Sequence, residues 1–187
     1  ARDGRASDLR LEGRLCRHHS KPRLRTHELW HADHSDGVQR LVLAAHPGSY
    51  IAPHSHSEQW EILTLLHGRI TLLTFSDDGL VLGRYGLQAG DAMELPAGTL
   101  HTLIIQEPVC LFEAKPGPFR PSSFAPWAPQ ENTPEVTEFQ EWLERAEIGS
   151  RYPGMDIVSF GPTIRGAHAP GERVEVASVG KAWHLLR

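Results

Sequence analysis

The sequence predicts an all-β domain, a sandwich or barrel, followed by one peripheral helix. Three observations support this prediction: short apolar segments recur between residues 38 and 115, turns containing Gly or Pro separate them, and one helical pattern follows a Pro-rich stretch. Short strands at regular spacing with turns between them are typical of sandwiches and barrels. The 187 residues are enough for one domain with a hydrophobic core.

The strands are expected where apolar and β-branched residues gather between turn residues. Pro47-Gly48 and His67-Gly68 turn the chain, and Ser76-Asp-Asp-Gly79 predicts a hairpin with Gly79 at positive φ. Pro53 cannot donate a ladder hydrogen bond, so its segment is expected at a sheet edge or a bulge. The expected strands cover residues 38–46, 50–56, 60–66, 70–75, 80–87, 91–95, 100–106 and 109–115.

A helix is expected after the last strand. Residues 115–129 are rich in proline and are expected to wrap the barrel as an extended segment. Thr133-Pro134-Glu135 then predicts a helix start, because it combines a cap residue, a proline at the first helical position and an acid in the first turn. Apolar residues recur at helical spacing from there to Gly149, which ends the pattern. The predicted parts are an N-terminal extension (1–37), the barrel (38–118), the Pro-rich wrap and helix (119–149) and a C-terminal tail (150–187).

Composition and charge argue against several classes of partner. The net charge of −4 predicts no nucleic-acid partner, and the chain contains no apolar run long enough for a transmembrane helix, so no membrane partner is expected. The two cysteines, Cys16 and Cys110, are far apart and form no C-x-x-C motif. This cysteine usage favours a reducing, cytoplasmic location.

Three histidines and one glutamate are expected to form a metal site. His54 and His56 occupy alternate positions of an expected strand, so their side chains project to one face. Glu61 opens the next apolar segment, and His101 follows the turn residues Pro96-Ala-Gly98. Imidazole and carboxylate ligands suit one divalent transition metal ion, such as zinc, iron, nickel or manganese.

The spacing of these residues carries more weight than any one of them. It reads G-x5-H-x-H-x4-E-x6-G from Gly48 to Gly68, and G-x5-P-x-G-x2-H from Gly90 to His101. This pattern resembles the two-part motif of the cupin superfamily, which implies a double-stranded β-helix, or jelly-roll barrel, with these four ligands. Ile105 departs from the pattern, which often has asparagine at that place.

A closer resemblance covers residues 22 to 143. The segments 22–27, 38–41, 47–54, 94–98, 112–118 and 124–129 are similar to the WbuC family of cupin metalloproteins. That family is associated with O-antigen and other surface-polysaccharide gene clusters. The resemblance therefore implies a sugar or sugar nucleotide as ligand, without implying a reaction.

The tail resembles a different kind of protein. Residues 152–168, followed by Glu172-Arg173, are similar to the carboxy-terminal end of aminoacyl-histidine dipeptidases, a branch of the zinc-dependent M20 peptidases. In that family the histidine that matches His168 is a metal ligand. One histidine cannot hold a catalytic zinc pair, so no peptidase activity is expected.

Other candidate site residues lie close to the expected ligands in the sequence. Glu113 and Lys115 share one strand face and, if that face points inward, supply proton transfer or grip a carbonyl or phosphate; otherwise they form a weak surface ion pair. Tyr50 and Trp60 flank the ligands and are candidates for binding substrate or for core packing. Gln39 is a third candidate for binding substrate.

Several functions fit this reading of the sequence. The first is a metal-dependent enzyme acting on a small polar molecule, either an isomerase or epimerase, or an iron-dependent dioxygenase. The second is a metal-dependent binding module or sensor without turnover. The third, a scaffold cupin without metal, is disfavoured by the intact ligand set. Fold alone does not decide between them. The resemblance to cupins also implies a homodimer.

Overall fold

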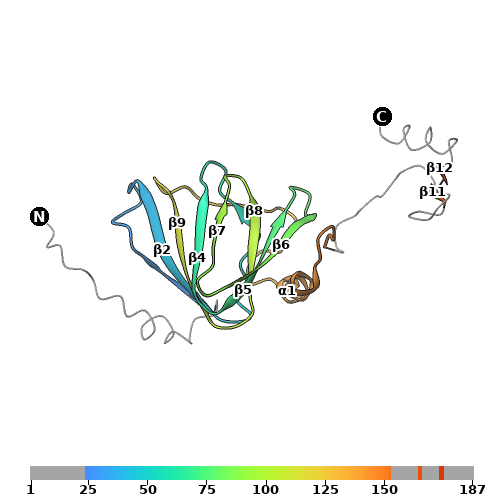
Figure 1. Ribbon diagram of the computed structural model, residues 1–187, viewed down its shortest axis with the longest axis horizontal. Helices are drawn as coiled ribbons and strands as arrows, with labels where there is room; N and C mark the ends of the chain where they lie inside the picture. The colour runs from blue at the N-terminus through green and yellow to red at the C-terminus, as the bar shows by residue number, and fades with distance from the viewer. Residues whose placement is uncertain (1–23, 153–163, 166–172, 175–187) are drawn as a thin grey trace, which may run out of the picture. The chain divides into compact units, whose positions relative to one another are not determined.

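Two five-stranded antiparallel sheets form the body of the protein. The structure is a computed structural model that describes residues 24–152, 164–165 and 173–174. The first sheet has the order β1-β2-β9-β4-β7 and the second β10-β3-β8-β5-β6 (Figure 1). The strands are β1 Arg25–Leu29, β2 Val38–Ala45, β3 His54–Ser55, β4 Glu61–His67, β5 Arg69–Phe75, β6 Val81–Gln88, β7 Ala92–Leu95, β8 Leu100–Ile105, β9 Val109–Pro116 and β10 Ser123–Phe124.

This strand order confirms the predicted all-β, jelly-roll barrel with a peripheral helix. Consecutive strands such as β4 and β5 lie in different sheets, while β5 and β6 pair as a hairpin around the expected turn at Gly79. The two sheets enclose one hydrophobic core. Leu43, Leu63 and Leu111 come from the first sheet, and Leu72 and Leu103 from the second.

The alternation along two strands of the first sheet aims polar groups into this core. On β4 the buried Glu61, Leu63 and Leu65 alternate with half-buried residues. On β9, Leu111 is fully buried in the core, so the residues at i+2 and i+4, Glu113 and Lys115, face the same interior. The inward orientation of that pair argues against a surface ion pair, and the proton-transfer or ligand-binding role stays a prediction.

Two segments differ from the expected strands. The first ligand strand was expected over 50–56, but β3 contains only His54 and Ser55, since Pro53 removes a ladder donor directly before it. β1 lies inside the expected N-terminal extension and pairs with β2 from Arg25↔Ala45 to Leu29↔Leu41. The first sheet therefore begins 13 residues before the expected barrel boundary at residue 38.

Helix α1 (Glu135–Arg145) packs on the second sheet, beside β5 and β6 in Figure 1. Phe139, Trp142 and Leu143 are buried in a second core that includes Leu73 and Phe75. The helix begins after Pro134 without a side-chain cap bond, rather than with the expected cap at Thr133, and it ends at Arg145, four residues before Gly149. Within the described part of the chain, no helix is long and apolar enough to cross a membrane.

Arg84 of β6 fastens the end of this helix to the barrel. Its guanidinium donates to the carbonyl oxygens of Leu143 (3.3 Å), Glu144 (3.0 Å) and Ala146 (3.0 Å). Arg84→Ala is expected to lower the free energy of unfolding by about 1–2 kcal/mol, because these helix-end carbonyls lose their donor. Urea unfolding followed by tryptophan fluorescence measures the loss. Arg69→Ala, at an exposed position, is the control, and equal losses in both variants would contradict the role given to Arg84.

A second unit spans residues 153–187. Its described residues form two short paired strands, β11 Ile164–Arg165 and β12 Arg173–Val174. His168 and most of the tail that resembles dipeptidases lie outside the described residues, so that resemblance stays a prediction.

Candidate metal centre

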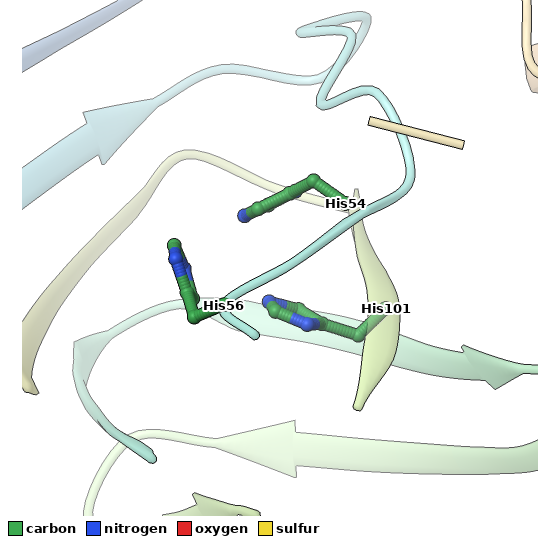
Figure 2. Close-up of side chains that lie close together, drawn as sticks. All are labelled: His54, His56 and His101. Atoms are coloured by element: carbon green, nitrogen blue, oxygen red, sulfur yellow. The ribbon is translucent and has the colours of Figure 1, made fainter. Parts of the chain in front are cut away.

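Three imidazoles converge where β3 pairs with β8. His54 of β3 pairs directly with His101 of β8, and His56 follows β3 by one residue. One ring nitrogen from each lies within 4.8 Å of the other two. The ring centroid of His54 lies 4.5 Å from that of His101 and 5.3 Å from that of His56. Figure 2 shows the three rings gathered around one space, as the sequence predicts.

Backbone carbonyls orient two of these rings. The Nδ1 atom of His54 lies 2.9 Å from the carbonyl oxygen of Ala52, and Nδ1 of His101 lies 3.0 Å from that of Thr99. A carbonyl only accepts, so each Nδ1 carries the proton and each Nε2 presents a lone pair. This is the arrangement that metal-bound histidines adopt, since the outer hydrogen bond sets the tautomer and the ring direction.

The turn before His101 connects the two halves of the motif. Gly98 has a φ of +80°, a left-handed conformation that glycine adopts without strain. Its amide donates to the carbonyl oxygen of His56 over 2.8 Å. The glycine therefore holds the loop that carries His101 against the loop that carries His56.

Glu61 contacts two of the three imidazoles from the floor of the site. Its Oε2 lies 3.2 Å from Nε2 of His101, and its Oε1 lies 3.5 Å from Nε2 of His56. Because Nδ1 of His101 already donates to Thr99, the lone pair of its Nε2 faces a carboxylate oxygen. Two such lone pairs repel one another unless a proton or a metal ion lies between them. The donor set therefore fits a divalent transition metal ion bound by three imidazoles and one carboxylate.

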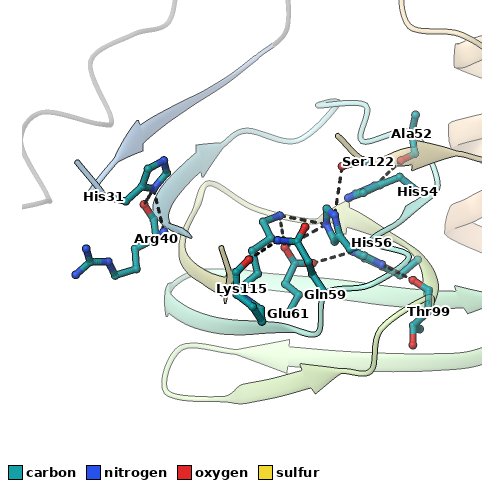
Figure 3. A network of polar contacts seen from close by, with 12 residues as sticks. His31, Arg40, Ala52, His54, His56, Gln59, Glu61, Thr99, Lys115 and Ser122 are labelled. Atoms are coloured by element: carbon teal, nitrogen blue, oxygen red, sulfur yellow. Dashed lines mark hydrogen bonds and ion pairs between the residues drawn. The ribbon is translucent and has the colours of Figure 1, made fainter. Parts of the chain in front are cut away.

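Lys115 places a positive charge against the same groups. Its Nζ lies 2.9 Å from Oε1 of Glu61 and 3.1 Å from Nε2 of His56, as the dashed lines in Figure 3 show. The ammonium donates to Nε2 of His56, so this nitrogen also presents a lone pair. The Nδ1 atom of His56 faces the hydroxyl of Ser122 at 3.5 Å. All three imidazoles thus share one tautomer.

Burial and charge shift the pKa values of the carboxyl and imidazole groups here. Burial, with the neighbouring His101, lowers the pKa of His54 to about 3, so the ring is neutral, as metal binding requires. Burial opposes ionisation of Glu61. The hydrogen bonds that His101 and His56 donate when their Nε2 atoms carry protons, together with the charge of Lys115, outweigh burial and hold the pKa of Glu61 below its usual value. Burial and the charge of Glu61 raise the pKa of Glu113 to about 8.

A cavity of about 90 Å³ opens beside these residues inside the barrel. Its polar wall consists of His54, His101, Glu61, Glu113 and Arg25. Its apolar wall consists of Leu43, Ile51, Leu63 and Leu103. The volume is several times the roughly 10–15 Å³ that one buried water needs, so the cavity accepts a group of a handful of heavy atoms.

The structure brings some predicted site residues to this cavity and places others elsewhere. Glu113 lines it, and Lys115 contacts Glu61 and His56 beside it. Tyr50 packs in the second core instead, with its hydroxyl donating to the carbonyl oxygen of Pro129 over 2.7 Å.

Trp60 and Gln39 also lie away from the described cavity wall. Trp60 is 39% exposed, because it precedes the inward-facing Glu61 and neighbouring strand positions point to opposite sides. Gln39 is buried, with its amide donating to the carbonyl oxygen of Asp36 over 3.0 Å. The substrate-binding roles expected for Tyr50, Trp60 and Gln39 stay predictions that this geometry does not support.

Sequence reasoning missed Arg25. The segment Arg-Thr-His-Glu-Leu of β1 has no apolar alternation, so nothing local identifies it as a strand. Only its pairing with β2 carries Arg25 to the cavity.

Comparison with known sequences gives partial matches. The profile of a domain of unknown function, DUF6016, matches residues 10–87, which is less than half of the chain. A 54-residue segment is 46% identical to the cytosol non-specific dipeptidase of Escherichia coli (strain K12), and it covers 29% of this chain and 11% of that enzyme. The chain thus spans about a tenth of the length of that relative, and the relative's activity does not follow for this protein.

Similar solved structures share the barrel at low identity. KdgF from Halomonas sp. is 19% identical, with a TM-score of 0.44 over 54% of this chain and 85% of that one. A Klebsiella pneumoniae protein with a double-stranded β-helix domain is 20% identical, with a TM-score of 0.47 over 56% and 87%. An oxalate oxidase is 17% identical, with a TM-score of 0.48 over 68% and 69%. Likeness at this level is silent on substrate and reaction, and the jelly-roll assignment stands on the strand order and pairing of this chain.

Proposed function

We propose that this protein binds one divalent transition metal ion through His54, His56, His101 and Glu61, and uses it to bind a small polar metabolite in the cavity. The observation that supports this most strongly is the convergence of the three imidazole nitrogens within 4.8 Å. Backbone carbonyls hold two of these rings in the tautomer that a metal requires. Chance clustering of surface histidines would not give rings that are both buried and oriented.

We assign two different roles to Lys115 and Glu113: Lys115 positions the ligand Glu61, and Glu113 transfers a proton. The bound ion would act as a Lewis acid toward the metabolite or lower the pKa of a bound water. Lys115 holds Glu61 in place and keeps it ionised. Glu113 lines the cavity and, with its raised pKa, holds a proton at neutral pH in the metal-free chain. It is therefore the group we assign to proton transfer at a bound metabolite.

This assignment favours turnover over a pure binding role. A general acid or base next to the open coordination position would distinguish an enzyme from a sensor. Glu113 is the candidate for this role, because it lines the same cavity as His54, His101 and Glu61. Isomerisation or epimerisation would use its proton directly, whereas an iron-dependent dioxygenase would use the open positions of the ion. The sugar or sugar nucleotide implied by the resemblance to the WbuC family would place only a small reacting group in a cavity of about 90 Å³.

The first test is metal binding by the chain prepared without a histidine tag. The protein is dialysed against Zn²⁺, Mn²⁺, Ni²⁺ or Fe²⁺ in turn, and bound metal is measured by inductively coupled plasma mass spectrometry. We expect about one tightly held ion per chain for at least one of these metals. Less than about 0.1 equivalent of every metal would contradict the proposed function.

Glu113→Gln tests turnover separately from metal binding. We expect this variant to keep the full metal content, because Glu113 contacts the ligand Glu61 and is not itself one of the four proposed ligands. Metal-dependent deuterium uptake by a panel of aldoses in D₂O, read by NMR, is expected to fall by about 100-fold or more, the usual scale for loss of a general acid or base. Loss of metal from the variant would contradict the role assigned to Glu113. Oxygen uptake in place of exchange would favour the dioxygenase.

A further inference from the structure

We infer that Arg25 makes the cavity beside the three imidazoles selective for a carboxylate, to which its guanidinium donates hydrogen bonds. This inference rests on the proposed function and deepens it by naming the chemical class of the ligand. Arg25 lines the same cavity as His54, His101 and Glu113, and β1 brings it there from outside the metal-binding motif. The wall of the cavity thus includes proposed metal ligands and also Arg25.

The guanidinium is held in place by three hydrogen bonds and keeps further N–H groups for a ligand. It donates to both carboxylate oxygens of Glu131, over 2.9 Å and 3.2 Å, and to the carbonyl oxygen of Tyr50. A guanidinium has five N–H groups, so among the described residues these three bonds leave two for a ligand. The side chain of Arg25 is only about one fifth exposed, so its guanidinium is held in one orientation before a ligand binds.

The balance of charge around the cavity favours an anion. Glu131 offsets Arg25 and Glu61 offsets Lys115 through direct ion pairs. A divalent ion at the three imidazoles then leaves a surplus of positive charge, even when Glu113 is ionised. An anionic ligand neutralises that surplus in a buried site, where charge interactions are strong.

The shape and lining of the cavity favour a carboxylate over phosphate. The remaining wall is aliphatic, from Leu43, Ile51, Leu63 and Leu103, and suits a short carbon chain. A planar carboxylate matches the guanidinium fork and occupies less space than a tetrahedral phosphate with its hydration. The volume of about 90 Å³ limits the buried part to a few carbon atoms.

Calorimetric titration of the zinc-loaded chain tests this inference. The probes are acetate, propionate and butyrate, with acetamide, propionamide and butyramide as uncharged matches and inorganic phosphate as the competing anion. We expect the carboxylates to bind about tenfold or more tightly than their amides and than phosphate, since a charge-assisted bond to arginine is lost in the amides. Equal binding of acids and amides, or tighter binding of phosphate, would overturn the inference.

Two variants of the Arg25–Glu131 pair separate ligand binding from a purely structural role. Arg25→Gln is expected to weaken carboxylate binding by about tenfold or more and to keep one zinc per chain. Glu131→Gln frees the guanidinium from its counter-ion and is expected to tighten carboxylate binding by about threefold or more. If the pair were only structural, both variants would weaken binding or neither would change it, and either result would overturn the inference.

The zinc content of each sample distinguishes the two failures. A chain that holds zinc but does not discriminate carboxylates would refute the role of Arg25 and leave the metal site standing. A chain that holds no zinc would refute the proposed function itself.

Discussion

Replacing His54 or His101 by alanine is expected to remove the bound metal. Each variant deletes one of three converging imidazoles and leaves the lone pairs of the others without an ion that they can share. We expect the metal affinity to fall by more than the roughly 10–100-fold that follows changes in the groups surrounding a metal site. Bound metal per chain after dialysis, measured by mass spectrometry, should drop from about one to below about 0.1.

A histidine outside the proposed site, His67, provides the control for this experiment. His67 lies at the exposed end of β4, and His67→Ala should keep the full metal content. Circular dichroism of all three variants checks that the barrel is retained. Full metal content in both His54→Ala and His101→Ala would dismiss the site as assigned here.

Lys115→Met is expected to cause the largest loss of stability, and the size of that loss should depend on metal. Without metal, Lys115 is the full positive charge held 2.9 Å from the buried Glu61 carboxylate. Removing one partner of a buried pair costs about 3–5 kcal/mol of unfolding free energy, because the other charge stays buried without compensation. With zinc bound, the ion supplies the positive charge, so the loss should fall to less than about half of that value.

Urea unfolding in EDTA and in excess zinc measures both losses. The double variant Glu61→Gln with Lys115→Met removes both charges and is expected to lie within about 1–2 kcal/mol of the original protein in EDTA. If Lys115→Met lowers the free energy of unfolding equally with and without zinc, the ammonium and the metal ion do not compensate the charge of the same carboxylate, and the prediction is wrong.

The four proposed metal ligands could be selected from the sequence because a metal site constrains spacing as well as residue type. The glycines of the motif place turns, and the interval from His54 to His56 places two side chains together. Gly98 shows why the spacing matters: its positive φ and its bond to the carbonyl of His56 join the two halves of the site. The strands were predictable for a similar reason, since apolar alternation is a local property of the chain.

The rest of the cavity depends on interactions that are distant in sequence. Arg25 reaches it only because β1 pairs with β2, and β1 itself has no apolar pattern. The inward direction of Glu113 follows from the burial of Leu111 two residues earlier, which the sequence alone leaves open. Tyr50 and Trp60 show that closeness in sequence does not fix direction: Tyr50 packs in the second core, as one of its two readings expects, and Trp60 is exposed.

Anomalous X-ray diffraction from crystals of the zinc-loaded protein, collected at the zinc edge, tests the central claim most directly. We predict one strong anomalous peak per chain, about 2.0–2.2 Å from the Nε2 atoms of His54, His56 and His101 and from an oxygen of Glu61. A fully loaded protein whose only peak lies elsewhere on the surface, or whose imidazoles point away from the ion, would contradict the account.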